Sequence, residues 1–92
     1  MLALVTTGQF RKDYKRVKKR GYNMRLLNDV INLLLNEQTL GEQYRDHGLV
    51  GNYAGFRECH ISPNWLLIYA IDNKQLILTA SRKGTHSDLF AK

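Results

Sequence analysis

The stretch Trp65-Leu66-Leu67-Ile68-Tyr69-Ala70-Ile71 decides the fold that this sequence predicts. A strand with one face in water alternates apolar and polar residues, whereas this run is apolar at nearly every position. We therefore predict a strand that is covered on both faces and lies at the centre of a sheet. A chain of 92 residues builds one hydrophobic core, so we expect a single domain over residues 1–92.

Two shorter runs flank this strand and are predicted to pair with it. Turn-forming residues stand between the runs, at Ser62-Pro63-Asn64 and at Asp72-Asn73-Lys74. Connections this short join antiparallel strands. The predicted meander has strands at Phe56–Ile61, Trp65–Ile71 and Gln75–Ser81.

The residue pattern of the N-terminal half predicts one strand followed by two helices. Leu2–Thr6 fits a buried strand or a sheet edge, and Thr6 or Thr7 offers a helix-capping hydroxyl. The first helix has apolar residues at helical spacing and a basic outer surface, and it stops at Gly21. Asn23 caps a second, more apolar helix, and the short connection predicts an antiparallel helix pair. The predicted class is α+β: an N-terminal strand, a helical hairpin, then an antiparallel sheet.

The chain is strongly basic, with 14 Lys and Arg residues against 8 Asp and Glu, a formal charge of +6 and a pI near 9.7. Such a surface attracts RNA, DNA or an acidic protein partner. The single cysteine, Cys59, cannot form an intramolecular disulfide, and no leader-like segment opens the chain. No apolar run approaches the roughly 20 residues of a membrane helix. We expect a cytoplasmic protein without membrane contact.

All three histidines, His47, His60 and His86, lie in the C-terminal half beside cationic or turn-forming residues. A ribonuclease needs a base for the 2′-hydroxyl proton, an acid for the leaving 5′-oxygen, and cations facing the phosphorane. Histidine suits the first two tasks because its unperturbed pKa is about 6.5, and arginine suits the third. The cations available for that task are Arg57, Arg82 and Lys83.

Other interpretations of these residues are weaker or inert. Each histidine also fits a surface or capping role, and Trp65 fits the core. No close His or Cys pair has the spacing of zinc motifs, so no metal site is predicted. No Gly-x-Ser-x-Gly nucleophile motif occurs. Within the strand Phe56–Ile61, alternation places Glu58 and His60 on one face and Arg57 on the other.

Four blocks of sequence follow one another in a recognisable order. They are Tyr44-Arg45-Asp46-His47, Gly55-Phe56-Arg57-Glu58-Cys59-His60-Ile61, Pro63-Asn64-Trp65-Leu66-Leu67-Ile68-Tyr69 and Arg82-Lys83-Gly84-Thr85-His86-Ser87-Asp88-Leu89-Phe90. Together they resemble the YafQ branch of the RelE/ParE toxin superfamily. The resemblance covers nearly the whole chain, including the two predicted helices.

The resemblance implies a small basic toxin of a bacterial type II toxin–antitoxin module, held inactive by an acidic DinJ/RelB-like antitoxin. YafQ-like members cut translated mRNA in the A site of the 70S ribosome, without a metal or other cofactor. The implied fold is the microbial-ribonuclease-like α+β sheet of RelE, which agrees with the predicted elements. The implied location is the cytoplasm.

The resemblance also implies site residues. His47, His60, Arg82 and His86 fall on catalytic positions of the family, with His86 and one other histidine dividing the proton transfers. Asn64 stands where close relatives carry Asp; it cannot take up a proton, but it can orient a neighbour by hydrogen bonding. The implied substrate-binding residues are Phe90, Lys83, Trp65, Arg57 and Asn64.

Two other functions remain open from the sequence. A ParE-like toxin that inhibits DNA gyrase would have the same fold, although it has no evident need for three histidines. A catalytically weak module that binds RNA or antitoxin is the other, because Asn64 replaces an acidic residue. In either case, an acidic segment that folds on binding is expected to cover the helices or fill the cationic cleft.

Overall fold

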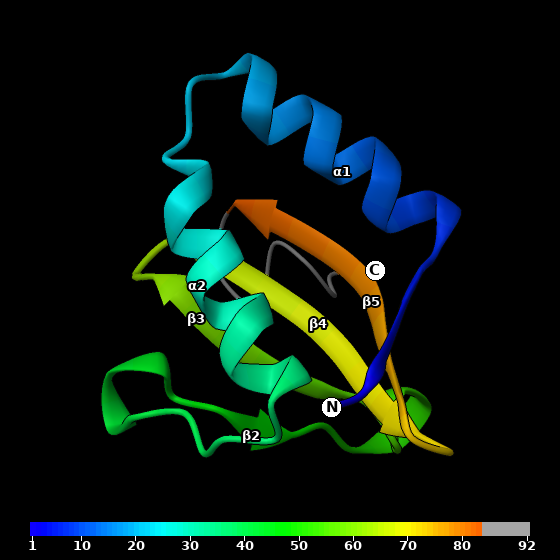
Figure 1. Cartoon of the computed structure of the whole chain (residues 1–92). Helices are drawn as coiled ribbons and strands as arrows, with labels where there is room; N and C mark the ends of the chain where they lie inside the picture. Colours follow the sequence, from blue (N-terminus) through cyan, green and yellow to red (C-terminus); the bar gives the residue numbers. More distant parts are fainter. Residues whose placement is uncertain (84–92) are drawn as a thin grey trace.

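Five strands form one sheet in the part of the chain that the structure describes, residues 1–83 (Figure 1). The structure is a computed structural model. The sheet has the strand order β1-β5-β4-β3-β2. In chain order the elements are β1 (Ala3–Thr6), α1 (Gly8–Lys19), α2 (Met24–Leu35), the 3-10 turn η1 (Glu42–Tyr44), β2 (His47–Gly48), the 3-10 turn η2 (Gly51–Tyr53), β3 (Arg57–Ser62), β4 (Trp65–Asp72) and β5 (Gln75–Lys83).

The central strand is β4, as predicted, with β3 and β5 antiparallel on its two sides. β1 pairs with β5 in parallel, from Ala3 opposite Gln75 to Thr6 opposite Leu78. The sheet is therefore mixed rather than wholly antiparallel. β2, which the sequence did not predict, adds two residues to the opposite edge by pairing with β3. The elements are those of the predicted α+β class.

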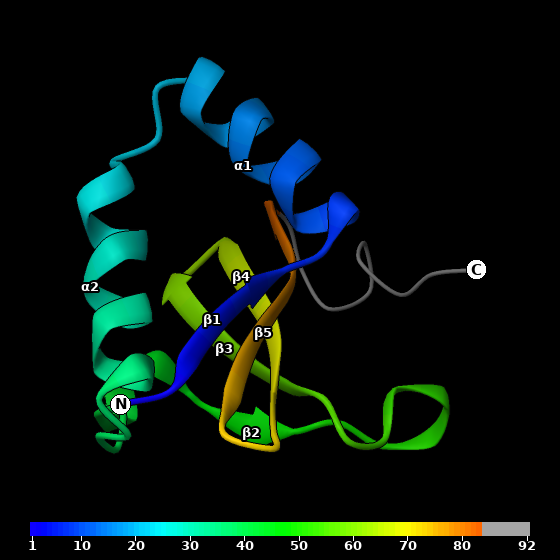
Figure 2. The same cartoon turned by 45° about the vertical axis from the view of Figure 1, so that its right-hand side comes forward.

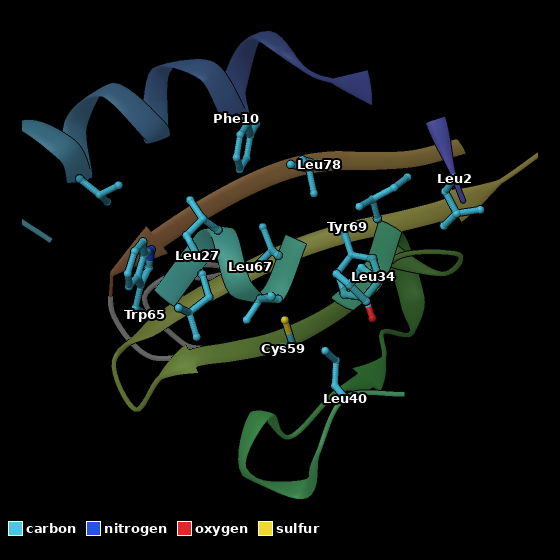
Figure 3. Packing of buried hydrophobic residues seen from close by; sticks show 14 residues of the cluster. Leu2, Phe10, Leu27, Leu34, Leu40, Cys59, Trp65, Leu67, Tyr69 and Leu78 are labelled. Carbon is cyan, nitrogen blue, oxygen red and sulfur yellow. The ribbon is translucent and has the colours of Figure 1, made fainter. Parts of the chain in front are cut away.

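β4 is buried on both faces, as its sequence requires. Alternate residues of a strand point to opposite faces, so Trp65, Leu67 and Tyr69 face the helices and join the core (Figure 3). Leu66 and Ile68 point the other way and are also buried. We call these surfaces of the sheet the helix face and the far face. The helix-face core also contains Leu2, Phe10, Val17, Leu27, Val30, Leu34, Cys59, Leu76 and Leu78.

The helices begin and end where the sequence predicts. The Oγ1 of Thr7 accepts a hydrogen bond from the Phe10 N–H at 3.0 Å, and the Oδ1 of Asn23 accepts one from the Arg25 N–H at 3.1 Å. Gly21, with φ 82°, provides the left-handed exit from α1. No helix among residues 1–83 combines the length and the apolar character needed to cross a membrane.

The two helices diverge like the arms of a V instead of lying along each other (Figure 2). The predicted antiparallel packing of the helix pair is therefore wrong. α1 packs on β5 and α2 packs on β3, so each helix buries its apolar stripe against the sheet. The sequence shows the apolar stripe of each helix but not which surface covers it. Here both stripes are covered mainly by the sheet and not by the neighbouring helix.

α1 also closes one edge of the sheet, because β5 continues well beyond its last pair with β1. At the start of α1, Thr7 donates its hydroxyl to the carbonyl oxygen of Thr79 at 2.7 Å. Further along α1, the Asp13 carboxylate accepts the Ser81 N–H at 3.0 Å. These side chains thus satisfy backbone groups that another strand would have paired.

The turn between β4 and β5 allows a test of local backbone strain. Asn73 (φ 50°) and Lys74 (φ 61°) are both left-handed, as in the two-residue turns that favour Asn-Gly. Lys74→Gly removes the steric penalty of Cβ, so we expect urea unfolding to show a gain of about 1 kcal/mol. Lys74→Ala is the control, because it removes the same charge but keeps Cβ. Equal stability of the two variants would contradict this explanation.

Candidate active site

Cross-strand pairing places two predicted catalytic residues, His60 and Arg82, on the far face. Directly opposed residues of antiparallel strands share a face, and Leu66 of β4 lies opposite both His60 of β3 and Arg82 of β5. Neighbouring strands lie about 4.8 Å apart, so the backbones of β3 and β5 are separated by roughly 10 Å here. An imidazole and a guanidinium therefore flank one buried leucine, close enough to act on one phosphate.

A buried carboxylate and a second histidine extend this row on the far face. Glu58 precedes His60 by two residues on β3, lies opposite Ile68, and is only 2% exposed. His47 of β2 lies opposite Glu58, with its Nε2 3.4 Å from the Glu58 Oε1. The sequence placed Glu58 on the face of His60 but gave it no role. The missing information was the short strand β2, which brings His47 to it.

The ring of His47 shows where a proton is held. Its Nδ1 lies 2.7 Å from the carbonyl oxygen of Arg45, and a carbonyl oxygen only accepts, so Nδ1 carries a hydrogen. In a neutral ring, Nε2 then presents a lone pair to Glu58. The imidazole of His47 and the carboxylate of Glu58 thus form a close polar pair on the far face.

A hollow of about 380 Å³ opens on the far face beside Arg82. Ile68 and Ala80 of the sheet form part of its lining, and Phe56 adds an aromatic side chain. Its volume lies in the range of small-ligand sites. Apolar and aromatic walls with a guanidinium at one end suit a flat base attached to an anionic phosphate. The full lining is Thr7, Gln9, Asn52, Tyr53, Phe56, Ile68, Thr79, Ala80 and Arg82.

Two residues that were predicted to contact substrate, Trp65 and Arg57, lie on the helix face instead. Trp65 is 2% exposed, donates its Nε1–H to the Ser81 Oγ at 2.9 Å, and meets the ring of Tyr22 edge-on. Burial in the core keeps its ring from stacking on a base, so its position does not support a substrate contact. Arg57 points away from His60, as strand alternation predicted.

Arg57 belongs to a polar network that anchors the segment before β2. Its Nη2 lies 3.0 Å from the Asp46 Oδ2, and Tyr69 donates its hydroxyl to the Asp46 Oδ1. The hydrogen bond to Asp46 raises the pKa of Arg57. Burial, followed by the same carboxylate, raises the pKa of Tyr69. Because Asp46 directly precedes His47, the network fixes His47 from the opposite side of the sheet.

The structure covers the remaining predicted site residues only in part. Asn64 is exposed in the turn between β3 and β4. Lys83 ends β5, but its side chain lies outside the described part of the chain, as do His86 and Phe90. The convergence of all three histidines therefore stays a prediction. Within residues 1–83, no group of three or more His, Cys, Asp or Glu side chains is placed to hold a metal ion.

A mixed sheet with helices on one face and histidine, glutamate and arginine side chains on the other defines a small basic protein of the RelE-like class. The chain matches, over residues 2–91, the family described as the bacterial toxin of type II toxin–antitoxin system, YafQ. It belongs to this YafQ family, which confirms the resemblance recognised in the four sequence blocks.

Curated relatives agree with this membership. The chain is 40% identical to the mRNA interferase toxin YafQ of Escherichia coli K12 over 85 residues, which cover 91% of this chain and 90% of the relative. It is 37% identical to the putative toxin YafQ of Haemophilus influenzae over 89 residues, or 91% of this chain and 87% of the relative.

Solved structures share the whole fold. A copper-bound mutant toxin from Helicobacter pylori has a TM-score of 0.90 and 39% identity, covering 98% of this chain and 100% of that chain. YafQ from E. coli BL21(DE3) has a TM-score of 0.87 and 35% identity, covering 99% and 100%. The chain in the E. coli DinJ–YafQ complex has a TM-score of 0.86 and 36% identity, also covering 99% and 100%. The predicted RelE-like fold is confirmed.

Tyr69→Phe tests the network around Asp46. The variant deprives a mostly buried carboxylate of one donor, so the unfolding free energy at pH 7 should fall by about 1–2 kcal/mol. Because the pKa of Tyr69 is raised from 10.0, its stabilising effect is complete below pH 10 and decreases as the pH rises further. Urea unfolding between pH 9 and pH 11 should therefore show a shallower decline for Tyr69→Phe than for the parent.

The matched control is Tyr14→Phe, since the Tyr14 hydroxyl makes no hydrogen bond within residues 1–83. This control should leave the stability at pH 7 close to that of the parent. A parent and a Tyr69→Phe variant with the same stability at pH 7 and the same alkaline decline would refute the anchoring role.

Proposed function

We propose that this toxin is a ribosome-dependent mRNA endoribonuclease that cuts translated mRNA in the ribosomal A site. Cleavage uses acid–base catalysis without a metal ion, and it stops translation and growth from within the bacterial cytoplasm. The observation that carries the proposal is the common far face of His47, Glu58, His60 and Arg82. The name of the E. coli relative, an mRNA interferase, supports the same activity.

The reaction is a transesterification followed by separation of the two RNA pieces. The 2′-oxygen attacks the adjacent phosphorus while a base takes its proton. The P–O5′ bond then breaks, and an acid protonates the departing oxygen, which leaves a 2′,3′-cyclic phosphate and a 5′-hydroxyl end. Proton transfer by positioned side chains contributes about 10²–10⁴-fold to such a rate.

The side chains divide these tasks as follows. Arg82 faces the phosphorane oxygens, where a guanidinium stabilises developing negative charge. His86 and one of His47 and His60 exchange the two protons. The carboxylate of Glu58, 3.4 Å from His47, stabilises the charged imidazole that forms when His47 takes up a proton.

The other predicted contacts act on the substrate rather than on the protons. Phe90 orders the scissile nucleotide, and Lys83 adds positive charge near the phosphates. Asn64 orients a neighbouring group by hydrogen bonding and holds no transferable proton.

Ribosome dependence fits the small number of cations at the site. Tight RNA binding at physiological salt needs several phosphate contacts, each releasing counterions. Among the described residues, the far-face row contributes one guanidinium, that of Arg82. A ribosome that already holds the mRNA in the A site removes the need for the toxin to bind the mRNA tightly by itself. The +6 charge of the toxin favours its approach to ribosomal RNA.

The proposed partner is an acidic antitoxin that covers the outer surface of the helices. A second hollow lies between β1, α1 and α2, where apolar Leu4, Phe10 and Ile31 adjoin the cations Arg11 and Lys15. Leu4 is 50% exposed. Apolar anchors rimmed by cations suit an acidic segment that folds on binding. The E. coli relative was crystallised with DinJ, which supports a partner of this kind.

His86→Ala tests the chemistry directly. Loss of one proton-transfer group should lower the mRNA cleavage rate in a reconstituted translation reaction by about 10²-fold or more. A circular dichroism spectrum equal to that of the parent is the control, since it shows that the substitution has changed the chemistry and not the fold. Primer extension on the reporter mRNA measures the cleavage.

Three comparisons make this experiment decisive. The parent should cut mRNA on translating ribosomes and leave the same mRNA intact without ribosomes. Trp65→Phe keeps the core but removes the indole, so it should cut at close to the parental rate. Cleavage by His86→Ala at the parental rate, or inhibition of gyrase supercoiling by a parent that cuts no mRNA, would overturn the proposal.

Leu4→Asp tests the proposed antitoxin surface. A carboxylate in the apolar hollow repels an acidic partner and removes an anchor, so the affinity for the cognate antitoxin should fall at least tenfold by calorimetry. mRNA cleavage should be unchanged, because Leu4 lies outside the far-face row. Val50→Asp, at a residue 84% exposed and distant in sequence from the helices, is the matched control. Equal antitoxin affinity for both variants would contradict this surface.

A further inference from the structure

Asp13 of α1 is a fully buried carboxylate, with 0% exposure, in a helix that is otherwise rich in surface cations. An aspartate is rarely buried to this extent unless it is paired. Its neighbours on α1 include Arg16, whose Nη1 lies 3.7 Å from the Asp13 Oδ1. Arg16 is half exposed, so this contact alone does not account for a buried charge.

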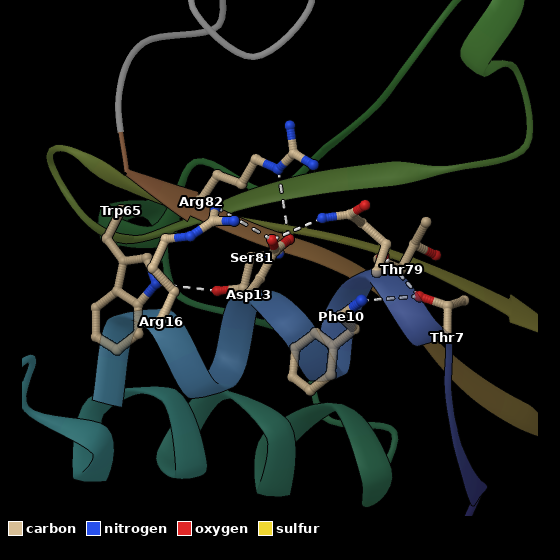
Figure 4. A network of polar contacts seen from close by, with 9 residues as sticks. Thr7, Phe10, Asp13, Arg16, Trp65, Thr79, Ser81 and Arg82 are labelled. Carbon is tan, nitrogen blue, oxygen red and sulfur yellow. Dashed lines mark hydrogen bonds and ion pairs between the residues drawn. The ribbon is translucent and has the colours of Figure 1, made fainter. Parts of the chain in front are cut away.

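The two carboxylate oxygens are held by different partners (Figure 4). Oδ1 accepts a hydrogen bond from the side-chain amide of Gln9 at 2.8 Å. Oδ2 accepts the Ser81 N–H at 3.0 Å and the Nε–H of Arg82 at 3.4 Å. The Ser81 N–H and the Gln9 amide thus fix the carboxylate of Asp13, which in turn contacts Arg82 at Nε alone.

The contact with Asp13 uses only the Nε of Arg82, so the two terminal nitrogens of the guanidinium, Nη1 and Nη2, remain available. Within residues 1–83, the two terminal nitrogens of Arg82 make no hydrogen bond or ion pair, and Figure 4 shows them turned away from Asp13. Those nitrogens form the fork that binds phosphate. Gln9 and Arg82, both contacts of Asp13, line the hollow on the far face.

We propose that Asp13 is a positioning residue for RNA cleavage, which aims the Arg82 guanidinium at the scissile phosphate. The proposal rests on the nuclease function proposed above. A free arginine side chain has about 2 kcal/mol of rotamer entropy to lose when it binds a phosphate. Because Asp13 holds Arg82, the side chain loses this entropy when the protein folds and not when it binds RNA. The guanidinium is therefore in place before the reaction begins.

A purely structural role for Asp13 predicts a different pattern. Its bond to the Ser81 N–H closes the edge of β5, and loss of that bond would lower stability whatever residue stood at position 82. Positioning requires that the effect on cleavage depends on Arg82. A double-mutant cycle separates the two roles, because it measures that dependence.

The experiment compares Asp13→Asn in the parent and in an Arg82→Lys background. Asparagine keeps an oxygen at the Oδ2 position for both the Ser81 N–H and the Arg82 Nε–H, and the amide of Gln9 can reverse to accept from the new amide group. The substitution therefore removes only the negative charge that holds the guanidinium. In the parent, we expect the single-turnover cleavage rate on programmed ribosomes to fall at least tenfold, with little change in the toxin concentration that gives half-maximal rate.

The Arg82→Lys background gives the opposite expectation. A lysine ammonium has no planar fork that Asp13 could aim at a phosphate, so Asp13→Asn should leave its cleavage rate unchanged or raise it. An equal fall in both backgrounds, or no fall in the parent, overturns the positioning role. If the parent cuts no mRNA, the proposed nuclease function is wrong. If Arg82→Lys cuts at the parental rate, the role proposed for the Arg82 guanidinium in that function is wrong.

A second measurement needs no variant that alters folding. In ¹⁵N-labelled parent protein, the Nε–H signal of Arg82 should exchange with water at least tenfold more slowly than that of Arg25, a surface arginine of α2. Arg82→Lys assigns the signal by removing it. An Nε–H that exchanges as fast as that of Arg25 shows that Asp13 does not hold Arg82 and overturns the proposal.

Discussion

Burial of β4 on both faces is the constraint on which the rest of this structure depends. One set of its side chains, including Leu67, packs under the helices, while the alternate set, including Leu66, supports the far face. Because β4 is central, its pairing with β3 and β5 determines on which face of the sheet each residue of those two strands lies. His60 and Arg82 are brought together in this way, although 22 positions separate them in the sequence. The main hydrophobic core and the row of His47, Glu58, His60 and Arg82 thereby lie on opposite sides of one sheet within a chain of 92 residues.

Two buried or half-buried carboxylates connect the sides of the sheet. Asp46 holds Arg57 and Tyr69 on the helix face while its neighbour His47 lies on the far face. Asp13 closes the edge of β5 and contacts Arg82. Replacing a buried ion pair by apolar residues is often neutral or stabilising, so such groups are poor evidence for stability. Their geometric effect is clearer, since each fixes the backbone or the side chain of a residue on the far face.

The sequence predicted those features that local patterns determine. The central strand, the Thr7 and Asn23 caps and the stop at Gly21 each follow from a few adjacent residues. Features set by distant contacts were missed: the divergent helices, the parallel edge strand and the two-residue β2 all depend on which surfaces meet. Strand alternation correctly separated His60 from Arg57. The resemblance nevertheless suggested substrate contacts for Trp65 and Arg57, because a family block gives positions and not the faces of the sheet on which they lie.

The central claim is that RNA is cut on the far face and not on the helix face. A structure of the toxin on a ribosome, with 2′-O-methyl mRNA in the A site, tests it directly, since the blocked nucleophile preserves the substrate. The account predicts the scissile phosphate within about 3 Å of the Arg82 guanidinium, in line with charge-assisted hydrogen bonds, and on the same side of β4 as His60. A scissile phosphate bound against α1 and α2, with no RNA on the far face, would contradict it.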